Sequence, residues 1–297
     1  VHFACALFTN LSHDHLDYHG SMKAYAEAKA RLFDTPGLAA AVLNLDDVVG
    51  VQLSQKLARR GVRTIGYSLH GPLSGRGEAL WAHVQGAQLE IESTWGKARV
   101  ATGQVGRFNA ANALGVLGCV LAHGVSFREA VGLIENLPPV PGRMQALGEQ
   151  PLVVIDFAHS PDALEKVLLA LRPVADGRGG RLVAVFGAGG DRDAAKRPAM
   201  GAAAARLADR VLLTSDNPRS EDPLAIIGQI ASGIEKGHEV EADRARAISR
   251  AVAEAAPVDV VLIAGKGHES YQEIAGKRTA FSDESAARAA LAARGAR

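Results

Sequence analysis

The chain has 297 residues, with 33 Lys and Arg against 32 Asp and Glu, so its formal net charge is +1. Proteins that bind nucleic acids usually carry a large basic excess, and this balance argues against a nucleic-acid partner. A hydrophobic fraction of 47% and a charged fraction of 22% are typical of a globular protein with sizeable cores. The length predicts about two domains.

Cysteine and methionine usage bears on the compartment and on the origin of the chain. Two cysteines, Cys5 and Cys119, cannot form a disulfide framework or a short-spaced zinc site, which favours a reducing cytoplasm. No run approaches the ~18 apolar residues of a membrane span, and no secretory leader opens the sequence, so we expect no membrane association. Because Val1 comes first and the earliest methionine is Met22, we expect the chain to be the later part of a longer protein.

The first 45 residues predict alternating strands and helices. Residues 1–9 form an apolar run that ends at Asn10, as expected of a strand buried on both faces. Ser21 is placed to be the N-cap of a helix over 21–33, which Pro36-Gly37 would end. A second buried strand is predicted over 39–45.

In the next segment the pattern of apolar residues changes. Between 63 and 101, short stretches such as 88–93 alternate apolar and polar residues, which predicts antiparallel strands, and 109–122 returns to helical spacing. Three of the twelve prolines then fall within 137–143, which is typical of a linker. We therefore place the domain boundary after residue 143, with domains over 1–143 and 144–297.

The second half is a regular alternation that predicts a parallel sheet with right-handed crossovers. Ligands in such folds bind at the carboxyl ends of the strands, so the residues after each strand are the ones to inspect. The predicted strands are 152–157, 182–186, 211–214 and 258–264, and the helices between them are about 161–172, 195–207, 223–235 and 244–255.

Each of these strands is followed by a polar, turn-forming segment. These segments are 156–161, 187–193, 215–220 and 265–269. Each one alone can be a turn with a helix cap, but the four together face one edge of the sheet. Glycines in them let backbone amides approach an anion, and Arg192, Arg219 and Lys266 supply charge for acidic substrates.

Histidine is concentrated near the beginning of the chain. His2, His13, His15 and His19 precede residue 20, and three of them lie with aspartates directly after the first predicted strand. Imidazole and carboxylate are common ligands of divalent metals, so the group predicts a metal site. For any single histidine, a solvated loop residue is the alternative.

Two nucleotide-binding motifs are missing from these residues. The segment Gly187-Ala188-Gly189-Gly190 would need a further glycine at 192 to match the dinucleotide pattern, and that residue is Arg192. No P-loop pattern occurs either, so an ATP-binding P-loop, if the protein has one, lies upstream of Val1.

The motifs together resemble the Mur ligase family, and most closely its members that add diaminopimelate. The resemblance runs from Phe8-Thr-Asn-Leu-Ser-His-Asp-His-Leu-Asp-Tyr-His-Gly20 to Ser282-Asp283, in family order and spacing. It implies an α/β protein in which a partial P-loop-type nucleotide-binding central domain is followed by a Rossmann-like doubly wound C-terminal domain. The implied activity is ATP-dependent ligation of meso-2,6-diaminopimelate to UDP-N-acetylmuramoyl-L-alanyl-D-glutamate through an acyl phosphate, in peptidoglycan biosynthesis.

The resemblance also assigns nucleotide and metal residues. His15 stands at the position of a Mg²⁺-binding histidine, and Lys29 at that of a carbamylated lysine, whose carboxylate is a hard oxygen ligand suited to Mg²⁺. Arg143 matches an arginine that reaches the ATP phosphates across the hinge. The residues that match adenine or ribose contacts are Asn109, Asn112, Asp156 and His159.

The incoming amino acid is matched by Asp216-Asn217-Pro218-Arg219, the sequence that marks diaminopimelate-adding members of the family. Diaminopimelate carries a second carboxylate that lysine lacks, and a guanidinium is a good bidentate partner for it. Glu269 would hold the distal ammonium. The residues implied to bind diaminopimelate are Arg192, Asp216, Asn217, Arg219, Gly265 and Glu269.

The chain also departs from the family pattern, because the P-loop, a second magnesium-binding residue and the domain that holds the UDP sugar are missing from these residues. We therefore expect the 297 residues alone to be inactive, or to bind the amino acid only. A lysine-adding or folylpolyglutamate-type ligase is the other alternative. The expected partners are small molecules, namely ATP, Mg²⁺, the UDP-linked dipeptide and diaminopimelate, and we expect a monomer.

Overall fold

The computed structural model describes residues 2–12, 16–72, 77–85, 88–101, 106–137, 140–235 and 237–295. The chain divides into two compact units, 1–138 and 139–297.

The sheet of the first unit is parallel in one half and antiparallel in the other. Its order is β1-β2-β3-β4-β5-β6, with parallel pairing from β1 to β4 and antiparallel pairing from β4 to β6. The strands are β1 (Cys5–Phe8), β2 (Ala40–Asn44), β3 (Arg63–Ser68), β4 (Glu78–Gln85), β5 (Gln88–Ser93) and β6 (Gly96–Ala101). The prediction of antiparallel strands over 63–101 was wrong for β3, which is a buried central strand paired in parallel on both sides.

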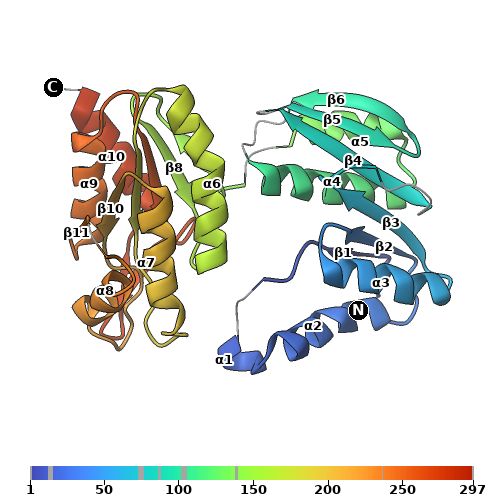
Figure 1. Cartoon of the computed structure of the whole chain (residues 1–297), viewed down its shortest axis with the longest axis horizontal. Helices are drawn as coiled ribbons and strands as arrows, with labels where there is room; N and C mark the ends of the chain where they lie inside the picture. The colour runs from blue at the N-terminus through green and yellow to red at the C-terminus, as the bar shows by residue number, and fades with distance from the viewer. Residues whose placement is uncertain are drawn as a thin grey trace. The chain divides into compact units, whose positions relative to one another are not determined.

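Helices cover both faces of this sheet (Figure 1). Helix α4 packs across β1 to β4, and α5 packs on β6, whereas α3 packs on β2 and β3 with a separate core around Phe33 and Leu57. Gly118 lets α4 approach closely, because a Cβ there would lie 2.7 Å from Cγ1 of Val42. The helices are α1 (Leu16–His19), α2 (Met22–Ala30), the 3-10 turn η1 (Arg31–Asp34), α3 (Val48–Arg59), α4 (Arg107–Ala122) and α5 (Phe127–Glu135).

The structure confirms the predicted helix cap at Ser21 and shortens the first predicted strand. Ser21 caps α2, since its Oγ accepts a hydrogen bond from the Ala24 N–H at 3.2 Å. The strand predicted over 1–9 is shorter, because only Cys5–Phe8 pairs with β2. Within β1 the side chains of Ala6 and Phe8 are buried, whereas Cys5 and Leu7 are half-buried, so the strand is not buried on both faces as expected.

The sheet of the second unit has the order β11-β10-β9-β12-β8-β7 and is parallel except for β7. Its strands are β7 (Gln145–Leu147), β8 (Leu152–Asp156), β9 (Leu182–Phe186), β10 (Arg210–Leu213), β11 (His238–Val240) and β12 (Val260–Ala264). A separate hairpin joins β13 (Tyr271–Ile274) to β14 (Lys277–Ala280). The parallel sheet confirms the alternation read from the sequence.

Helices lie on both faces of this sheet as well. Helices α6, α7 and α8 pack against one another in series, and α9 and α10 pack together against the core that contains Ile155, Val183 and Leu212 (Figure 1). The helices are α6 (Pro161–Gly177), α7 (Lys196–Leu207), α8 (Pro223–Ala231), α9 (Arg244–Glu254) and α10 (Asp283–Gly295). This is a doubly wound α/β arrangement, which confirms the expected fold class.

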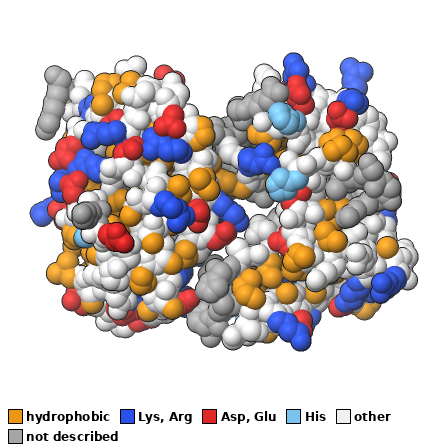
Figure 2. Space-filling model, in the orientation of Figure 1, with side chains coloured by type: hydrophobic (Ala, Val, Ile, Leu, Met, Phe, Trp, Pro, Cys, Tyr) orange, Lys and Arg blue, Asp and Glu red, His pale blue; other side chains and the backbone are white. Residues whose placement is uncertain are grey.

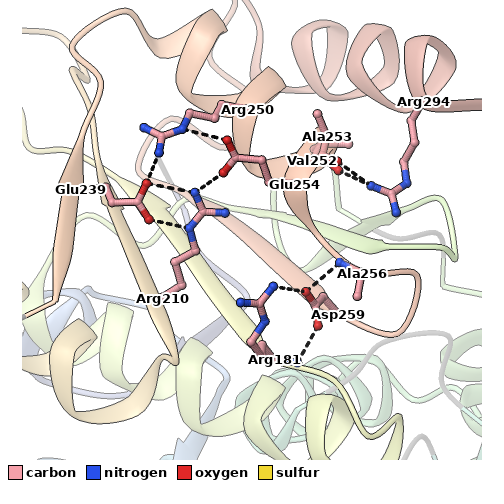
Figure 3. A network of polar contacts seen from close by, with 10 residues as sticks. All are labelled: Arg181, Arg210, Glu239, Arg250, Val252, Ala253, Glu254, Ala256, Asp259 and Arg294. Carbon is pink, nitrogen blue, oxygen red and sulfur yellow. Dashed lines mark hydrogen bonds and ion pairs between the residues drawn. The ribbon is translucent and has the colours of Figure 1, made fainter. Parts of the chain in front are cut away.

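The amino-terminal edge of this sheet is fastened by ion pairs (Figure 3). Arg210 opens β10 and binds Glu239 of β11 through two hydrogen bonds of 2.7 and 3.0 Å, and it also pairs with Glu254 of α9. Asp259, just before β12, accepts hydrogen bonds from the Arg181 backbone and side chain at 2.8 and 3.2 Å. These charges are paired within the protein, and ligands of parallel α/β sheets bind at the opposite, carboxyl edge.

The surface agrees with the near-zero net charge. Basic and acidic side chains are interspersed on the face that Figure 2 shows. Among the described residues, no helix has the length and apolar character needed to cross a bilayer.

Candidate functional site

Four strands of the second sheet end side by side, and their loops form the candidate site. The carboxyl ends of β8, β9, β10 and β12 meet at one edge because the strands are parallel neighbours. Backbone hydrogen bonds fix the loops to one another: Gly265 N donates to Asp156 O at 3.1 Å, and Gly190 N donates to Asn217 O at 2.9 Å.

Glycines allow this close packing of the loops. A Cβ on Gly190 would lie 1.9 Å from the Pro218 carbonyl oxygen, which no side chain can occupy. Gly265 has a φ of +119°, and a Cβ there would lie 2.4 Å from Oδ2 of Asp216. Both positions therefore require glycine for steric reasons, whatever else they contact.

Two arginines flank a third glycine in this edge. A Cβ on Gly189 would lie 3.0 Å from Nη1 of Arg219 and 3.8 Å from Cγ of Arg192. Arg219 has a φ of 53°, and its Nη1 donates to the Gly190 carbonyl at 2.6 Å. Arg192 is exposed. Two guanidinium side chains beside one loop make a favourable place for a carboxylate.

Lys266, Glu269 and Asn217 form a compact polar cluster beside these arginines. Lys266 is fully buried, and its Nζ donates to Glu269 Oε2 at 2.9 Å and to Asn217 Oδ1 at 3.0 Å. Asn217 Nδ2 donates to the same Glu269 oxygen at 2.8 Å. The ammonium of Lys266 is therefore used inside the protein, which corrects the expectation that it pairs with an acidic substrate.

A buried ion pair holds the ends of β10 and β12 in place. Arg244 binds Asp283 through two hydrogen bonds of 2.7 and 2.8 Å, and both side chains are buried. The same guanidinium donates to the carbonyls of Ser215 and Ala264, at 3.1 and 2.9 Å. Burial alone would lower the pKa of Arg244, but the adjacent Asp283 carboxylate more than offsets it and the pKa is raised.

A second buried arginine supports the loop after β9. Arg197 of α7 donates to both carboxylate oxygens of Glu221 at 2.8 Å and to the Gly189 carbonyl at 3.0 Å. Glu221 also accepts a hydrogen bond from the Asp191 N–H at 2.6 Å. The hydrogen bonds from Arg197 and from the Asp191 backbone lower the pKa of Glu221 to about 2. The Arg197–Glu221 pair therefore fixes the position of the loop that contains Gly189 and Asp191, next to Arg219.

An aromatic and cationic group lies at the end of β8. The Arg143 guanidinium carbon stands 4.5 Å from the centre of the Phe157 ring, which also contacts the rings of His159 and His268. Asp156 accepts hydrogen bonds from the Met144 and Ala158 N–H groups, at 2.9 and 2.8 Å. Burial raises the pKa of Asp156, although those two hydrogen bonds and the charge of Arg143 act in the opposite direction.

The predicted site residues of the first unit form a separate group. Lys29 is half-buried, and its Nζ donates to the Asn10 carbonyl at 3.2 Å and stands 5.0 Å from the Tyr25 ring centre. Asn109 and Asn112 lie in the first turns of α4, one buried and one exposed.

His13 and His15 lie outside the described residues, so the structure gives no position for the predicted metal ligand His15. Within the part of the chain that is described, no group of three or more His, Cys, Asp or Glu side chains is arranged to hold a metal ion.

Several residues that organise the site were missed by sequence reasoning. Arg197 and Arg244 are buried helix residues outside the motif segments named above. Phe157 and His268 stack on each other in the aromatic group, but neither was assigned a role from the sequence. A charged residue at a position that should face the core is the signal that could have identified the two arginines.

The comparisons with known proteins cover both units. Residues 1–120 match the Mur ligase middle domain, and residues 142–267 match the Mur ligase glutamate ligase domain. The chain is 52% identical over 306 residues to a UDP-N-acetylmuramoyl-L-alanyl-D-glutamate--2,6-diaminopimelate ligase of Ralstonia nicotianae. It is also 52% identical over 301 residues to the protein of the same name in Chromobacterium violaceum. These matches cover 99% and 100% of this chain but 59% and 60% of the relatives, so the chain spans about three fifths of their length.

A solved structure gives the same result. A structure of UDP-N-acetylmuramoyl-L-alanyl-D-glutamate--2,6-diaminopimelate ligase superposes with a TM-score of 0.63 at 38% identity, covering 98% of this chain and 60% of the other. Both family domains therefore follow one another in this sequence, in the order that the resemblance implied. The chain belongs to the Mur ligase family.

Proposed function

We propose that this chain forms the amino-acid-binding domain and part of the nucleotide-binding domain of an ATP-dependent ligase that adds meso-diaminopimelate to UDP-N-acetylmuramoyl-L-alanyl-D-glutamate. The observation that carries the proposal is the placing of Arg219, Arg192, Asn217 and Glu269 at one edge of the second sheet. The relatives of this name, at 52% identity, support the same activity.

In this proposal the arginine pair binds the distal carboxylate of diaminopimelate. Arg219 presents a planar, permanently charged fork, and its Nη1 contact with Gly190 fixes its orientation. Glu269 accepts hydrogen bonds from Lys266 and Asn217, which hold it in place, and it would also accept one from the distal ammonium of diaminopimelate. Asp216 and Gly265 shape the wall beside them. Lysine lacks the second carboxylate, so it would leave the arginine charge without a partner.

The nucleotide is assigned to two groups of residues. In the first unit we assign Asn109 and Asn112 of α4 to the nucleotide, and in the second unit Asp156 and His159. Arg143 supplies positive charge to the phosphates. An aromatic ring, a guanidinium and a carboxylate at the end of β8 fit a nucleotide, because they offer a stacking surface, a phosphate partner and a hydroxyl acceptor.

Lys29 and His15 are assigned to magnesium, with Lys29 as its carbamate. The Lys29 ammonium is partly exposed, and it makes no ion pair with the carboxylates of the described residues. Addition of CO2 would therefore break no salt bridge to a described carboxylate. A bound Mg²⁺ would neutralise negative charge on the transferring phosphoryl group. The protein residues then hold the D-glutamate carboxylate for phosphorylation and the diaminopimelate amine for attack, and the site excludes water that would hydrolyse the acyl phosphate.

The proposal includes domains over 1–143 and 144–297, a cytoplasmic location and a monomeric protein acting on small molecules. Because the 297 residues contain no P-loop motif, we expect them to release no phosphate when mixed alone with ATP, Mg²⁺ and both substrates.

A competition assay tests the choice of amino acid. The full-length protein is given ATP, Mg²⁺, the UDP-linked dipeptide and equal concentrations of meso-diaminopimelate and lysine, and the products are separated by mass. We expect almost only the diaminopimelate product. A predominant lysine product would assign the site to a lysine-adding ligase, and no amide product at all would contradict the ligase activity.

A pair of variants on α2 tests the role of Lys29. Lys29→Ala in the full-length protein should abolish ligation, and added bicarbonate should not restore it. Lys23→Ala, on the exposed side of the same helix, is the matched control and should retain activity. Full activity of Lys29→Ala would exclude the carbamate.

A further inference from the structure

Cys5 of β1 and Cys119 of α4 face each other at the edge strand of the first sheet. The helix packs directly on this strand, since a Cβ on Gly115 would lie 3.1 Å from the Leu7 side chain, one helical turn before Cys119. Cys5 and Cys119 pack against the same hydrophobic core, both are free and half-buried, and each thiol affects the pKa of the other. The function proposed above makes no use of this pair.

Two basic side chains lie at this end of α4. Arg63 Nη1 donates to the Ala122 carbonyl at 3.2 Å, and His123 Nδ1 lies 2.8 Å from the Cys119 carbonyl. These contacts occupy carbonyls at the end of α4, whose partial negative charge would otherwise disfavour a thiolate. The hydrogen bond from Cys119 lowers the pKa of Cys5 to about 7, helped by the charges of His123 and Arg63 and opposed by burial. A thiol with these surroundings is reactive near neutral pH.

We propose that Cys5 and Cys119 are a redox modification site that closes to a disulfide on reaction with a low-molecular-weight disulfide. The Cys5 thiolate attacks one sulfur of the reagent, its sulfur–sulfur bond breaks, and one thiolate leaves. Cys119 then loses its proton to solvent, attacks the Cys5 sulfur and expels the second thiolate. The protein loses two electrons and two protons, and the small disulfide becomes two thiols.

The bridge would join strand β1 to helix α4. A reducing cytoplasm keeps both thiols reduced, so the disulfide forms under oxidising conditions and reverses afterwards. The helix that it fixes carries Asn109 and Asn112 in its first turns. The inference itself rests on the thiol geometry and not on the ligase activity.

Reaction with oxidised glutathione tests the inference. The purified protein is reduced, freed of reductant, incubated with oxidised glutathione near neutral pH, blocked with iodoacetamide and mapped by mass spectrometry. We expect a peptide that links Cys5 to Cys119. It should form about tenfold faster, or more, in the folded protein than in urea, because the fold already holds the thiols together and no long loop has to close.

Single variants separate the two steps. Cys119→Ser should stop at a glutathione adduct on Cys5, and Cys5→Ser should react slowly and give no linking peptide. A persistent glutathione adduct on Cys5 in the unchanged protein would overturn the proposal. So would a linking peptide that forms only in urea, or an absence of reaction at both sulfurs.

Discussion

The buried ammonium of Lys266 lies 2.9 Å from a carboxylate oxygen of Glu269, three residues further along the same loop. Because the lysine is fully buried and the glutamate is one quarter exposed, one end of this pair is fixed in the protein and the other reaches the edge of the site. Asn217 binds both partners. Lys266 therefore fixes the positions of Glu269 and Asn217, the two residues that we propose contact diaminopimelate.

Lys266→Met should weaken binding of diaminopimelate while ATP binding persists. Glu269 would lose its fixed partner, and we expect the KM for diaminopimelate to rise about tenfold, equivalent to about 1.4 kcal/mol, with the KM for ATP unchanged. Steady-state kinetics of the full-length protein measures both constants. The exposed Lys277 on β14 provides the control Lys277→Met, which should change neither. An equal rise in both KM values would indicate a general loss of structure instead.

Arg244→Leu should destabilise the second unit. The change leaves the Asp283 carboxylate buried and the carbonyls of Ser215 and Ala264 without their donor, and losing one partner of a buried pair costs about 3–5 kcal/mol. Urea unfolding followed by circular dichroism measures the loss. Arg246→Ala, two residues along α9 and largely exposed, should stay within about 0.5 kcal/mol of the unchanged protein. Similar effects of the two changes would contradict the structural role of Arg244.

Two glycine substitutions should act in opposite directions. Gly190→Ala would place a Cβ 1.9 Å from the Pro218 carbonyl oxygen, and the forced backbone shift should destabilise the protein by about 1–3 kcal/mol. Gly228, inside α8, has open space around it, so Gly228→Ala should stabilise by about 0.5–1 kcal/mol. Thermal unfolding midpoints give the sign of each change. A neutral Gly190→Ala would show that the loop can move away from Pro218.

The Arg197–Glu221 pair should contribute a pH-dependent part of the stability. The pKa of Glu221 is lowered from 4.5 to about 2, so its stabilising effect is complete above about pH 4.5 and is lost as the pH falls toward 2. Glu221→Gln should therefore be less stable than the unchanged protein at neutral pH, and the two unfolding free energies should converge near pH 2. A difference that is independent of pH would contradict this account.

Much of the fold could be predicted from the pattern of apolar residues along the sequence. The runs around β8, β9, β10 and β12 are almost wholly apolar, and a glycine or aspartate lies at the end of each strand or within three residues after it, so the strands and their parallel pairing were predictable. The edge strand β7, with three residues, and β11, with exposed ends, lack such a pattern, because edge strands are short and partly solvated. The direction of β3 was missed because its pairing depends on the connections around it and not on its own residues.

In the candidate site, too, some residues were predicted from the sequence and others were not. Arg219, Asn217 and Glu269 were named from motifs, and the structure brings Asn217 and Glu269 into a hydrogen bond of 2.8 Å. The arginines that support them were not predicted, because Arg197 and Arg244 occur in arginine- and alanine-rich helices, where composition alone suggests an exposed side chain. The burial of Lys266 likewise depends on the hairpin β13-β14 and on Tyr271, whose ring lies 5.5 Å from its Nζ. The burial of these three charged side chains depends on tertiary packing, which local sequence patterns do not reveal.

The most direct test of the account is the kinetic effect of Arg219→Ala on diaminopimelate. Loss of a charge-assisted pair worth about 3 kcal/mol should raise the KM for diaminopimelate about a hundredfold and leave the KM for ATP unchanged. Arg288→Ala, an exposed arginine of α10, is the control and should leave both constants unchanged. The account predicts that full-length Arg219→Ala loses its preference for diaminopimelate over lysine. An unchanged KM for diaminopimelate in this variant would contradict the assignment of the site.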